Sequence, residues 1–329
     1  MKNILQKVLD PFVYLFWAAQ IQILVAFPPL HGLAIKHGMN ADRSRKLWIK
    51  LLFQVLVRAP GAFFAHVSDK IRRRTVLPRV SYAVTTRCTL NCDNCIVHVP
   101  DIEHPADIPA ERWIEDLQAL LQCVDTIYVL TLAGGEAFLH PQLDELLRFC
   151  AASSQIGDID VATNGTIIPN EEVLAALRDA KATVRISRYG AALQPKVEEL
   201  KSRLKEYSIA YMHEAGGYWY KPVSLDEIQP GSTKRRYRVC AQQLCLVYYH
   251  RQIHKCTASA VLAEVGDRIE AIDYVDLRDL SPAAFRAAYQ RWHKKRELTA
   301  CAYCPGASYE APRVPVAVQR ARNLSHTHR

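Results

Sequence analysis

From residue 80 onward, the chain alternates between short apolar runs and segments with apolar residues at helical spacing. The apolar runs predict strands at 80–86, 126–132, 158–162, 182–187 and 209–213. The segments between them predict helices at 109–122, 142–151, 170–180 and 195–207. Strands that alternate with helices in this way indicate parallel β/α units. We therefore expect an α/β fold in which one parallel sheet forms most of a six-unit partial barrel.

The first 79 residues predict apolar and basic helices instead. Segment 11–27 carries no formal charge over seventeen residues, which is the lower limit for crossing a bilayer, and two prolines follow it. Segment 46–58 is apolar except for one narrow stripe, which consists of Lys46, Lys50, Gln54 and Arg58. A helix of this kind either lies on an anionic membrane surface or packs against its own protein, and the pattern fits both.

Composition narrows the class of protein. Half of the 329 residues are apolar, so the chain can bury a large core. The ten cysteines are mostly grouped at metal-ligand spacings, which predicts a reducing cytoplasm; Cys123 and Cys150 stand alone on apolar helical patterns and are expected to be buried. The net charge is +9, but no basic stripe interleaved with aromatic residues is present, so we expect no nucleic-acid partner.

One short run carries the strongest chemical signal. Cys88, Cys92 and Cys95 have the spacing CxxxCxxC directly after the first predicted strand. Three thiolates at this spacing can bind three corners of a 4Fe–4S cube and leave the fourth iron open for chemistry. Structural zinc is the alternative, but zinc sites usually close four ligands, and the nearest further candidate is His98.

This spacing, with Gly134, Gly135 and Glu136 after the second predicted strand, resembles the radical S-adenosylmethionine (SAM) superfamily. The resemblance covers about residues 80–319 and implies a partial (β/α)6 barrel. It implies that the cysteines hold a 4Fe–4S cluster that binds SAM, and that a reductant such as flavodoxin or ferredoxin drives cleavage of SAM to a 5′-deoxyadenosyl radical. Asn94 departs from the family, which commonly has an aromatic residue against the adenine at that position.

The resemblance also implies SAM contacts at the carboxyl ends of the strands, where the functional groups of parallel sheets gather. Gly134 and Gly135 lack a Cβ atom, so a ligand can approach their backbone closely, and Glu136 is expected to accept from the amino group of SAM. Asn164 and Ser187 end the next two strands. They either contact SAM, with Ser187 at the ribose, or form turns through their own side chains.

A second cysteine group occupies the last third of the chain and consists of Cys240, Cys245, Cys256, Cys301 and Cys304. Segment 246–255 predicts a β-hairpin, and thiols on both sides of it with a later CxxC can close four corners of a cube or a zinc site. The arrangement resembles the twitch domain, a shortened SPASM module with one auxiliary 4Fe–4S cluster, although Arg251 stands where a hairpin glycine is usual.

By the spacing of that module, the expected ligands are Cys240, Cys256, Cys301 and Cys304. Which of Cys240 and Cys245 is the ligand stays open. We take Cys245 as the spare thiol, which either returns a hydrogen atom to a substrate radical or is a buried, inert cysteine.

We expect three parts: a helical extension at 1–79 that is a candidate for membrane contact, a radical SAM barrel at 80–225 and a small twitch-like domain at 226–329. The expected activity removes hydrogen from a sugar, glycan or lipid-linked substrate and gives dehydrogenation or epimerisation. The alternatives are a maturase of a ribosomally made peptide and, in a different class, a non-enzymatic iron–sulfur electron carrier.

The residues after the last predicted strand are candidate substrate contacts, although ordinary packing explains each of them as well; they are His213, Glu214, Trp219 and Tyr220. The expected location is the cytoplasm, either free or on the cytoplasmic face of the membrane.

Overall fold

The computed structural model describes residues 74–190, 193–213, 218–226, 231–265 and 273–320, together with Ala19 and Asp69. The apolar helices expected before residue 74 and the candidate substrate contact Glu214 lie outside these residues. No helix within the described ranges is long and apolar enough to cross a membrane.

One nine-stranded sheet organises the described chain. Eight strands follow the order β10-β9-β8-β2-β3-β4-β5-β6, and β1 pairs with β3. The strand bounds are β1 Val76–Leu77, β2 Val80–Thr85, β3 Thr126–Gly134, β4 Ile156–Thr163, β5 Thr183–Ile186, β6 Ala210–His213, β8 Leu246–Tyr249, β9 Gln252–His254 and β10 Tyr274–Asp276. Five parallel strands, β2 to β6, match the five predicted ones. A sixth parallel strand, β8, lies on the free edge of β2.

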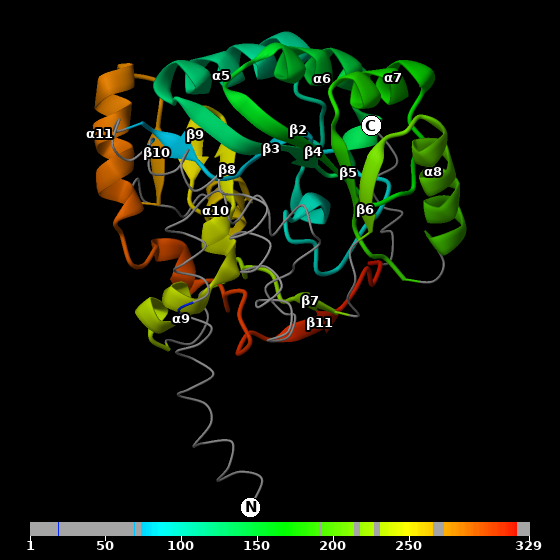
Figure 1. Cartoon of the computed structure of the whole chain (residues 1–329). Helices are drawn as coiled ribbons and strands as arrows, with labels where there is room; N and C mark the ends of the chain where they lie inside the picture. The colour runs from blue at the N-terminus through cyan, green and yellow to red at the C-terminus, as the bar shows by residue number, and fades with distance from the viewer. Residues whose placement is uncertain are drawn as a thin grey trace, which may run out of the picture.

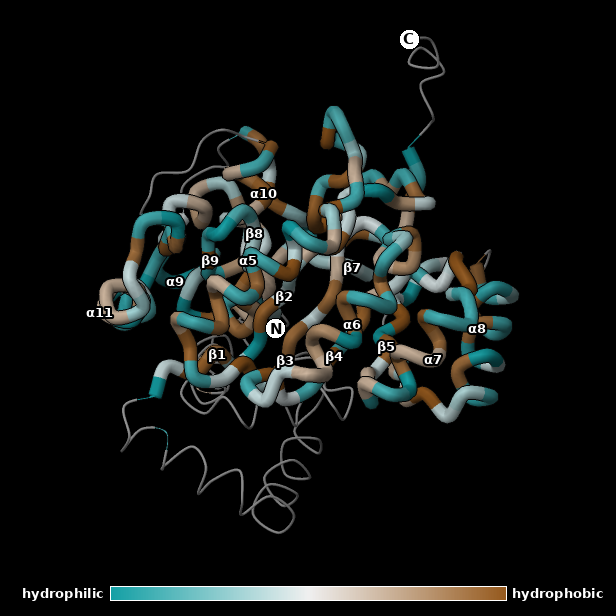
Figure 2. The backbone as a smooth tube through the Cα atoms, turned by 90° about the horizontal axis from the view of Figure 1, so that it is seen from above, coloured by the Kyte–Doolittle hydropathy of each residue, from teal (hydrophilic) through white to brown (hydrophobic). Residues whose placement is uncertain are grey.

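Four helices connect the parallel strands and cover one side of the sheet (Figure 1). Their bounds are α5 Ala110–Cys123, α6 Leu143–Ala152, α7 Glu171–Asp179 and α8 Gln194–Glu206. Each was predicted to within a few residues, because its buried side recurs every three or four residues, as at Trp113, Leu117 and Leu120. Figure 2 shows the same pattern along α8, whose turns alternate between hydrophobic and hydrophilic residues. The result is the expected α/β partial barrel.

Aromatic packing joins α5 to the sheet. The rings of Tyr82 on β2 and Trp113 on α5 are stacked with centroids 4.6 Å apart, and Tyr248 on β8 meets Tyr82 edge-on at 5.0 Å. All three side chains are buried, and the Trp113 indole N–H donates to the carbonyl of Ala83 at 3.0 Å. Fully burying one side chain of this size contributes about 2–3 kcal/mol. The three rings therefore hold β2 against α5.

The predicted hairpin is formed by β8 and β9, which pair antiparallel. Its turn residues His250 and Arg251 have φ values of 49° and 59°, in the left-handed region that favours glycine. Arg251 occupies this position because its guanidinium reaches Asp116 on α5 at 2.6 Å, and that carboxylate is buried. An ion pair therefore holds the hairpin turn where glycine is usual.

The remaining elements include a smaller second core and a ribbon. The other described helices and short turns are η1 Val99–Asp101, η2 Ala137–Leu139, α9 Thr233–Val239, η4 Ala241–Leu244, α10 Thr257–Val265, α11 Pro282–His293 and η5 Thr299–Ala302. Of these, η2 and α11 contribute to the main core under the sheet. The second core packs Val223 against Tyr237, Leu262 and Leu298. A separate two-stranded ribbon pairs β7 Tyr218–Tyr220 with β11 Arg313–Pro315, antiparallel, and it lies below the sheet in Figure 1.

Candidate functional site

The loop after β2 carries the first three cysteines, and nearby N–H groups point at their sulfurs. The Leu90 amide donates to Cys88 Sγ at 3.5 Å, and the Gln319 side chain donates to Cys92 Sγ at 3.2 Å. At Cys95 the backbone amides of residues 97–99 lower the pKa of the thiol, against the rise caused by burial. N–H donors stabilise thiolate ligands, so this loop suits a metal cluster.

Burial makes these thiols unsuitable as free thiolates. It raises the pKa of Cys88 to about 11, with Glu136 and the neighbouring Cys95 and Cys92 adding to the effect. Burial likewise raises the pKa values of Cys92 and Cys95. Because a bound cation deprotonates its thiol ligands outright, the three sulfurs become thiolates when they ligate metal.

The glycines at the end of β3 hold the cysteine loop in place. A Cβ atom on Gly134 would lie 2.0 Å from the Thr85 carbonyl oxygen, and one on Gly135 would lie 2.1 Å from that of Arg87. The Gly135 amide donates to Thr85 at 3.0 Å, and the Glu136 amide donates to Arg87 at 2.8 Å. The backbone that leads to the first cysteine thus fills the Cβ direction of both glycines, and their contact with SAM stays a prediction.

Glu136 is fully buried and binds the end of β4. Its carboxylate accepts from the Thr163 hydroxyl and from the Asn164 amide, each at 2.7 Å, and from the Phe138 amide at 3.1 Å. Burial raises the pKa of Glu136, and these three donors oppose that rise. The carboxylate therefore links the end of β3 to the end of β4, close to Cys88.

Asn164 and Ser187 lie at the same edge of the sheet. The Asn164 amide side chain donates to Thr89 at 3.0 Å and to Cys88 Sγ at 3.6 Å, while its oxygen accepts from the Thr166 amide at 2.9 Å. The Ser187 amide donates to the carbonyl of Thr163 at 2.9 Å. Asn164 thus forms a turn, as its alternative interpretation predicted, and also contacts the cysteine loop.

Tyr189 and Trp219 form an aromatic pair that was not predicted from the sequence. Tyr189 follows β5, and burial raises its pKa, with smaller contributions from all three loop cysteines and from Glu136. Its ring meets that of Trp219 edge-on, with centroids 5.3 Å apart. Trp219 was a candidate substrate contact, whereas no spacing in the sequence connects it to Tyr189. At position 94, where an aromatic ring was expected from the resemblance, the chain has the small amide of Asn94, which contacts Asp93.

His98, the possible fourth zinc ligand, has both ring nitrogens engaged. Nδ1 contacts Asp101 at 2.9 Å and Nε2 contacts the carbonyl of Val223 at 2.9 Å. Its position ties the cysteine loop to the second core rather than to a metal. His213, another candidate, is half-buried, and burial together with Lys201 lowers its pKa.

Four of the five later cysteines line one cavity, and these are the four expected ligands, Cys240, Cys256, Cys301 and Cys304. The Ala307 amide donates to Cys240 Sγ at 3.4 Å, and the Gly306 amide donates to Cys304 Sγ at 3.3 Å. Burial raises the pKa values of Cys301 and Cys304 to about 12. The cavity therefore holds four thiols, of which Cys240 and Cys304 accept from backbone N–H groups, and in this it resembles the first cysteine loop.

Cys245 lies elsewhere. It directly precedes β8, and Leu246 pairs with Val80 at the start of β2, while Cys88 follows the end of β2. Since β2 and β8 are parallel, Cys245 lies at the opposite end of this strand pair from Cys88. Its thiol contacts the carbonyl of Leu246 at 3.8 Å. The hydrogen-donor role that we expected for Cys245 finds no support in this position.

The number of thiols in each set matches the corners of a 4Fe–4S cube, and zinc stays the alternative for the set of four. Within the described ranges, no three or more His, Cys, Asp or Glu side chains are arranged to hold one metal ion. Three thiols leave one corner open, and four thiols close every corner.

Comparison with known proteins identifies the part of the chain that carries the first site. Residues 82–210 match the radical SAM superfamily. The pre-heme d1 synthase of Dinoroseobacter shibae is 30% identical over 97 residues, which are 30% of this chain and 23% of that protein. The GTP 3′,8-cyclase of Syntrophomonas wolfei is 27% identical over 135 residues, 40% of this chain and 38% of that protein. This chain therefore spans well under half the length of both relatives.

Solved structures with a similar arrangement include BtrN in complex with AdoMet and 2-DOIA, at 13% identity and a TM-score of 0.42, covering 67% of this chain and 86% of that one. Streptococcus suis SuiB bound to its precursor peptide SuiA is 11% identical with a TM-score of 0.37 and covers 76% of each chain. The matched segment 82–210 includes the cysteine loop and the strand ends that surround it. Residues 82–210 thus match the radical SAM superfamily, and the cofactors that this family implies are a 4Fe–4S cluster and S-adenosylmethionine.

Proposed function

We propose that this chain cleaves SAM reductively and removes a hydrogen atom from a sugar, glycan or lipid-linked substrate. The observation that carries the proposal is the loop of Cys88, Cys92 and Cys95, which lies within the segment that matches the radical SAM superfamily and in which Cys88 and Cys92 accept from N–H donors. When bound there, the cluster and SAM supply a 5′-deoxyadenosyl radical. The protein's contribution is to orient the reactants and to exclude water.

Each nearby residue has a role in that task. The sulfurs of the three cysteines hold the cluster, and Gly135 allows their loop to pack directly on the end of β3. Glu136 joins β3 to β4, and its carboxylate, which accepts from three donors, keeps one further lone-pair site that we assign to the amino group of SAM. Tyr189 and Trp219 supply an aromatic surface on the side of β5.

We further propose dehydrogenation rather than epimerisation. An alcohol that loses one hydrogen atom, and then one electron and one proton, becomes a carbonyl compound. The four-cysteine cavity is where a group able to accept that electron would be held. Epimerisation needs a hydrogen donor at the radical, and Cys245 lies at the wrong end of β8 for that role.

Cleavage of SAM tests the first part. The protein is reconstituted anaerobically with iron and sulfide, reduced with dithionite and incubated with SAM, and 5′-deoxyadenosine is measured by chromatography. We expect formation by the wild type and none by the Cys88→Ala, Cys92→Ala, Cys95→Ala variant. Cys123→Ala is the matched control, because that thiol is buried at the end of α5. A wild type that never forms 5′-deoxyadenosine would leave the electron-carrier alternative.

The substrate is tested by the increase in 5′-deoxyadenosine formation when candidate substrates are added. Free sugars, nucleotide sugars, lipid-linked glycans and peptides form the panel. A product lighter by two hydrogen atoms indicates dehydrogenation, whereas a product whose mass is unchanged in H2O and one unit higher in D2O indicates epimerisation. Stimulation by peptides alone would replace the sugar proposal with the maturase alternative.

A further inference from the structure

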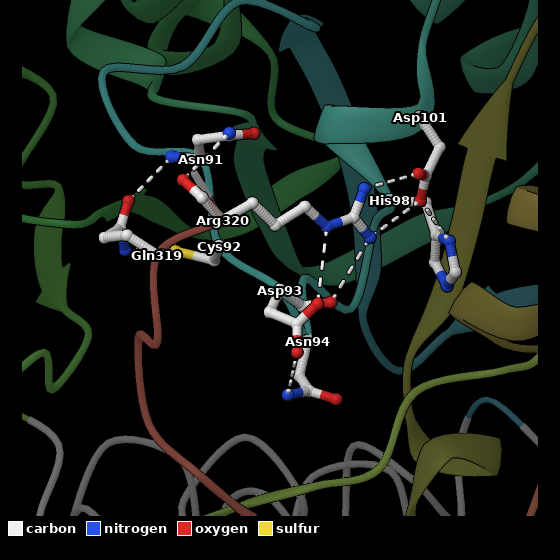
Figure 3. Close-up of polar contacts among 8 residues, drawn as sticks. All are labelled: Asn91, Cys92, Asp93, Asn94, His98, Asp101, Gln319 and Arg320. Carbon is white, nitrogen blue, oxygen red and sulfur yellow. Dashed lines mark hydrogen bonds and ion pairs between the residues drawn. The ribbon is translucent and has the colours of Figure 1, made fainter. Parts of the chain in front are cut away.

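A short segment far along the chain runs across the first cysteine loop. We call residues 317–320, which follow β11, the strap. The Asp93 amide donates to the carbonyl of Val318 and the Arg320 amide donates to that of Asn91, both at 2.7 Å. Cys92 and Gln319 form an antiparallel bridge between these two bonds. The strap therefore pairs with the loop as a strand would, and Figure 3 shows it passing beside Cys92.

The side chain of Gln319 is oriented by the loop itself. Its oxygen accepts from the Asn91 amide at 2.8 Å, so the oxygen must face that N–H group. The amide nitrogen then faces the other way and donates to Cys92 Sγ at 3.2 Å and to the carbonyl of Ala317 at 2.7 Å. Ala317 has a φ of 56°, in the left-handed region that non-glycine residues rarely adopt. That turn brings the carbonyl within reach of Gln319.

Arg320 secures the strap on both sides of the third cysteine. Its guanidinium donates to Asp101 at 2.6 Å and to the carbonyl of Asp93 at 3.3 Å, and it pairs with the Asp93 carboxylate at 3.5 Å (Figure 3). Asp101 also contacts His98 at 2.9 Å. Because Asp93 precedes Cys95 and Asp101 follows it, one side chain of the strap binds both arms of the loop.

We propose that Gln319 is a positioning residue for the first cluster, which it serves by hydrogen-bonding the Cys92 thiolate and raising the reduction potential of the cluster. The proposal rests on the function proposed above. Reduction adds negative charge that is shared by the ligand sulfurs, so an N–H donor stabilises the reduced state more than the oxidised state. The strap also covers the Cys92 side of the loop, and this slows the loss of iron.

The test compares Gln319→Leu and Gln319→Glu with Val318→Ala in the reconstituted full chain. Gln319 is exposed, so neither substitution opens a core. Val318 is the matched control, because its side chain is 46% exposed and its contact to the loop uses only the backbone. The reduction potential is measured by redox titration with electron paramagnetic resonance, and the first cluster is identified as the signal that changes when SAM is added.

We expect both Gln319 variants to titrate at lower potential than the wild type, with Gln319→Glu at least as low as Gln319→Leu, and Val318→Ala to titrate like the wild type. Gln319→Leu should also release iron to a chelator several times faster than Val318→Ala. A Gln319→Leu protein with the wild-type potential overturns the inference while the proposed function stands. A wild type without any SAM-responsive signal overturns both.

Discussion

The Cβ atom that Gly135 lacks would lie 2.1 Å from the carbonyl oxygen of Arg87. That carbonyl precedes Cys88, and the same hypothetical atom would lie 3.0 Å from the Cβ of Cys88. The end of β3 and the start of the cysteine loop are therefore packed backbone to backbone. A glycine in this motif controls where the first ligand of the cluster stands.

Gly135→Ala should displace the loop and reduce cluster binding. The added methyl group meets backbone atoms that cannot move aside, so we expect the free energy of unfolding to fall by about 1–3 kcal/mol. Urea unfolding and the iron content after reconstitution measure the two effects. Gly190→Ala is the control, because a Cβ atom there meets nothing within 4 Å. Equal iron content in both variants would contradict this account of the motif.

Two cysteines that are close in sequence, Cys240 and Cys245, should have different effects on the second cysteine site. Cys240 lines the four-thiol cavity, whereas Cys245 does not. Cys240→Ala should therefore lose the iron of the second cluster, and Cys245→Ala should keep the full wild-type iron content. Iron and sulfide are counted per chain after anaerobic reconstitution. The reverse pattern would show that the cavity assigns the wrong thiol.

Most of the barrel could be predicted from the sequence because its elements are long and periodic. The first strand and its helix are examples: Tyr82 and Trp113 occupy the buried positions of strong patterns. The position of β8 could not be predicted, because a strand that joins the sheet far along the chain leaves no local signal. The same hairpin shows why Arg251 was unexplained, since its partner Asp116 lies 135 residues away.

In the candidate site, too, local groups of residues could be predicted from the sequence, whereas contacts between distant residues could not. Local spacing predicted the thiols of Cys88, Cys92 and Cys95 as a group. Spacing favoured Cys240 over Cys245 but left the choice open, because both precede the hairpin and the three-dimensional path distinguishes them. Gln319 was missed because the residue it serves is 227 positions earlier in the chain.

The ion pair at the hairpin turn predicts unequal effects for two arginines that share one carboxylate. Arg251 reaches Asp116 at 2.6 Å, and Arg112 reaches it at 3.3 Å with a side chain that is 59% exposed. Arg251→Ala should lower the free energy of unfolding by about 1–2 kcal/mol, a value reduced from that of a fully buried pair because the guanidinium is partly exposed. Arg112→Ala should cost at most about 0.5 kcal/mol. Chemical denaturation of both variants measures the difference, and equal losses would show that Arg251 has no special role at the turn.

His293, at the end of α11, predicts a pH dependence of stability. Burial lowers its pKa from 6.5 to about 4, with Lys255 and Arg296 adding to the effect. The unfolded chain therefore binds more protons between these values. Stability from the neutral imidazole is complete above pH 6.5 and is lost as the pH falls toward 4, by about 2–3 kcal/mol.

Replacing this histidine should flatten that part of the pH profile. We expect His293→Leu to lose less stability than the wild type between pH 6.5 and 4, measured by denaturation at several pH values. His104→Leu is the control, because His104 is exposed. A profile of His293→Leu that parallels the wild type would assign the pH dependence to other groups.

Tyr189 and Trp219 lead to a prediction about SAM itself. The chain has Asn94 where an aromatic residue commonly faces the adenine, while the buried Tyr189 is near enough to the loop cysteines and Glu136 for them to raise the pKa of its hydroxyl. Stacking of a base on an aromatic ring contributes about 1–3 kcal/mol. If this ring supplies the adenine contact, Tyr189→Ala should weaken SAM binding by about ten- to a hundredfold, and Tyr189→Phe should retain most of the affinity, because the ring remains.

Equilibrium dialysis of SAM with the reconstituted protein measures both variants. Tyr218→Ala is the matched control, because the ring of Tyr218 lies under the guanidinium of Arg313 at 4.1 Å and not against Tyr189. A Tyr189→Ala protein that binds SAM normally but no longer responds to substrate would place this ring on the substrate side. In that case another group must hold the adenine, because the small amide of Asn94, which contacts Asp93, offers no surface comparable to an aromatic ring.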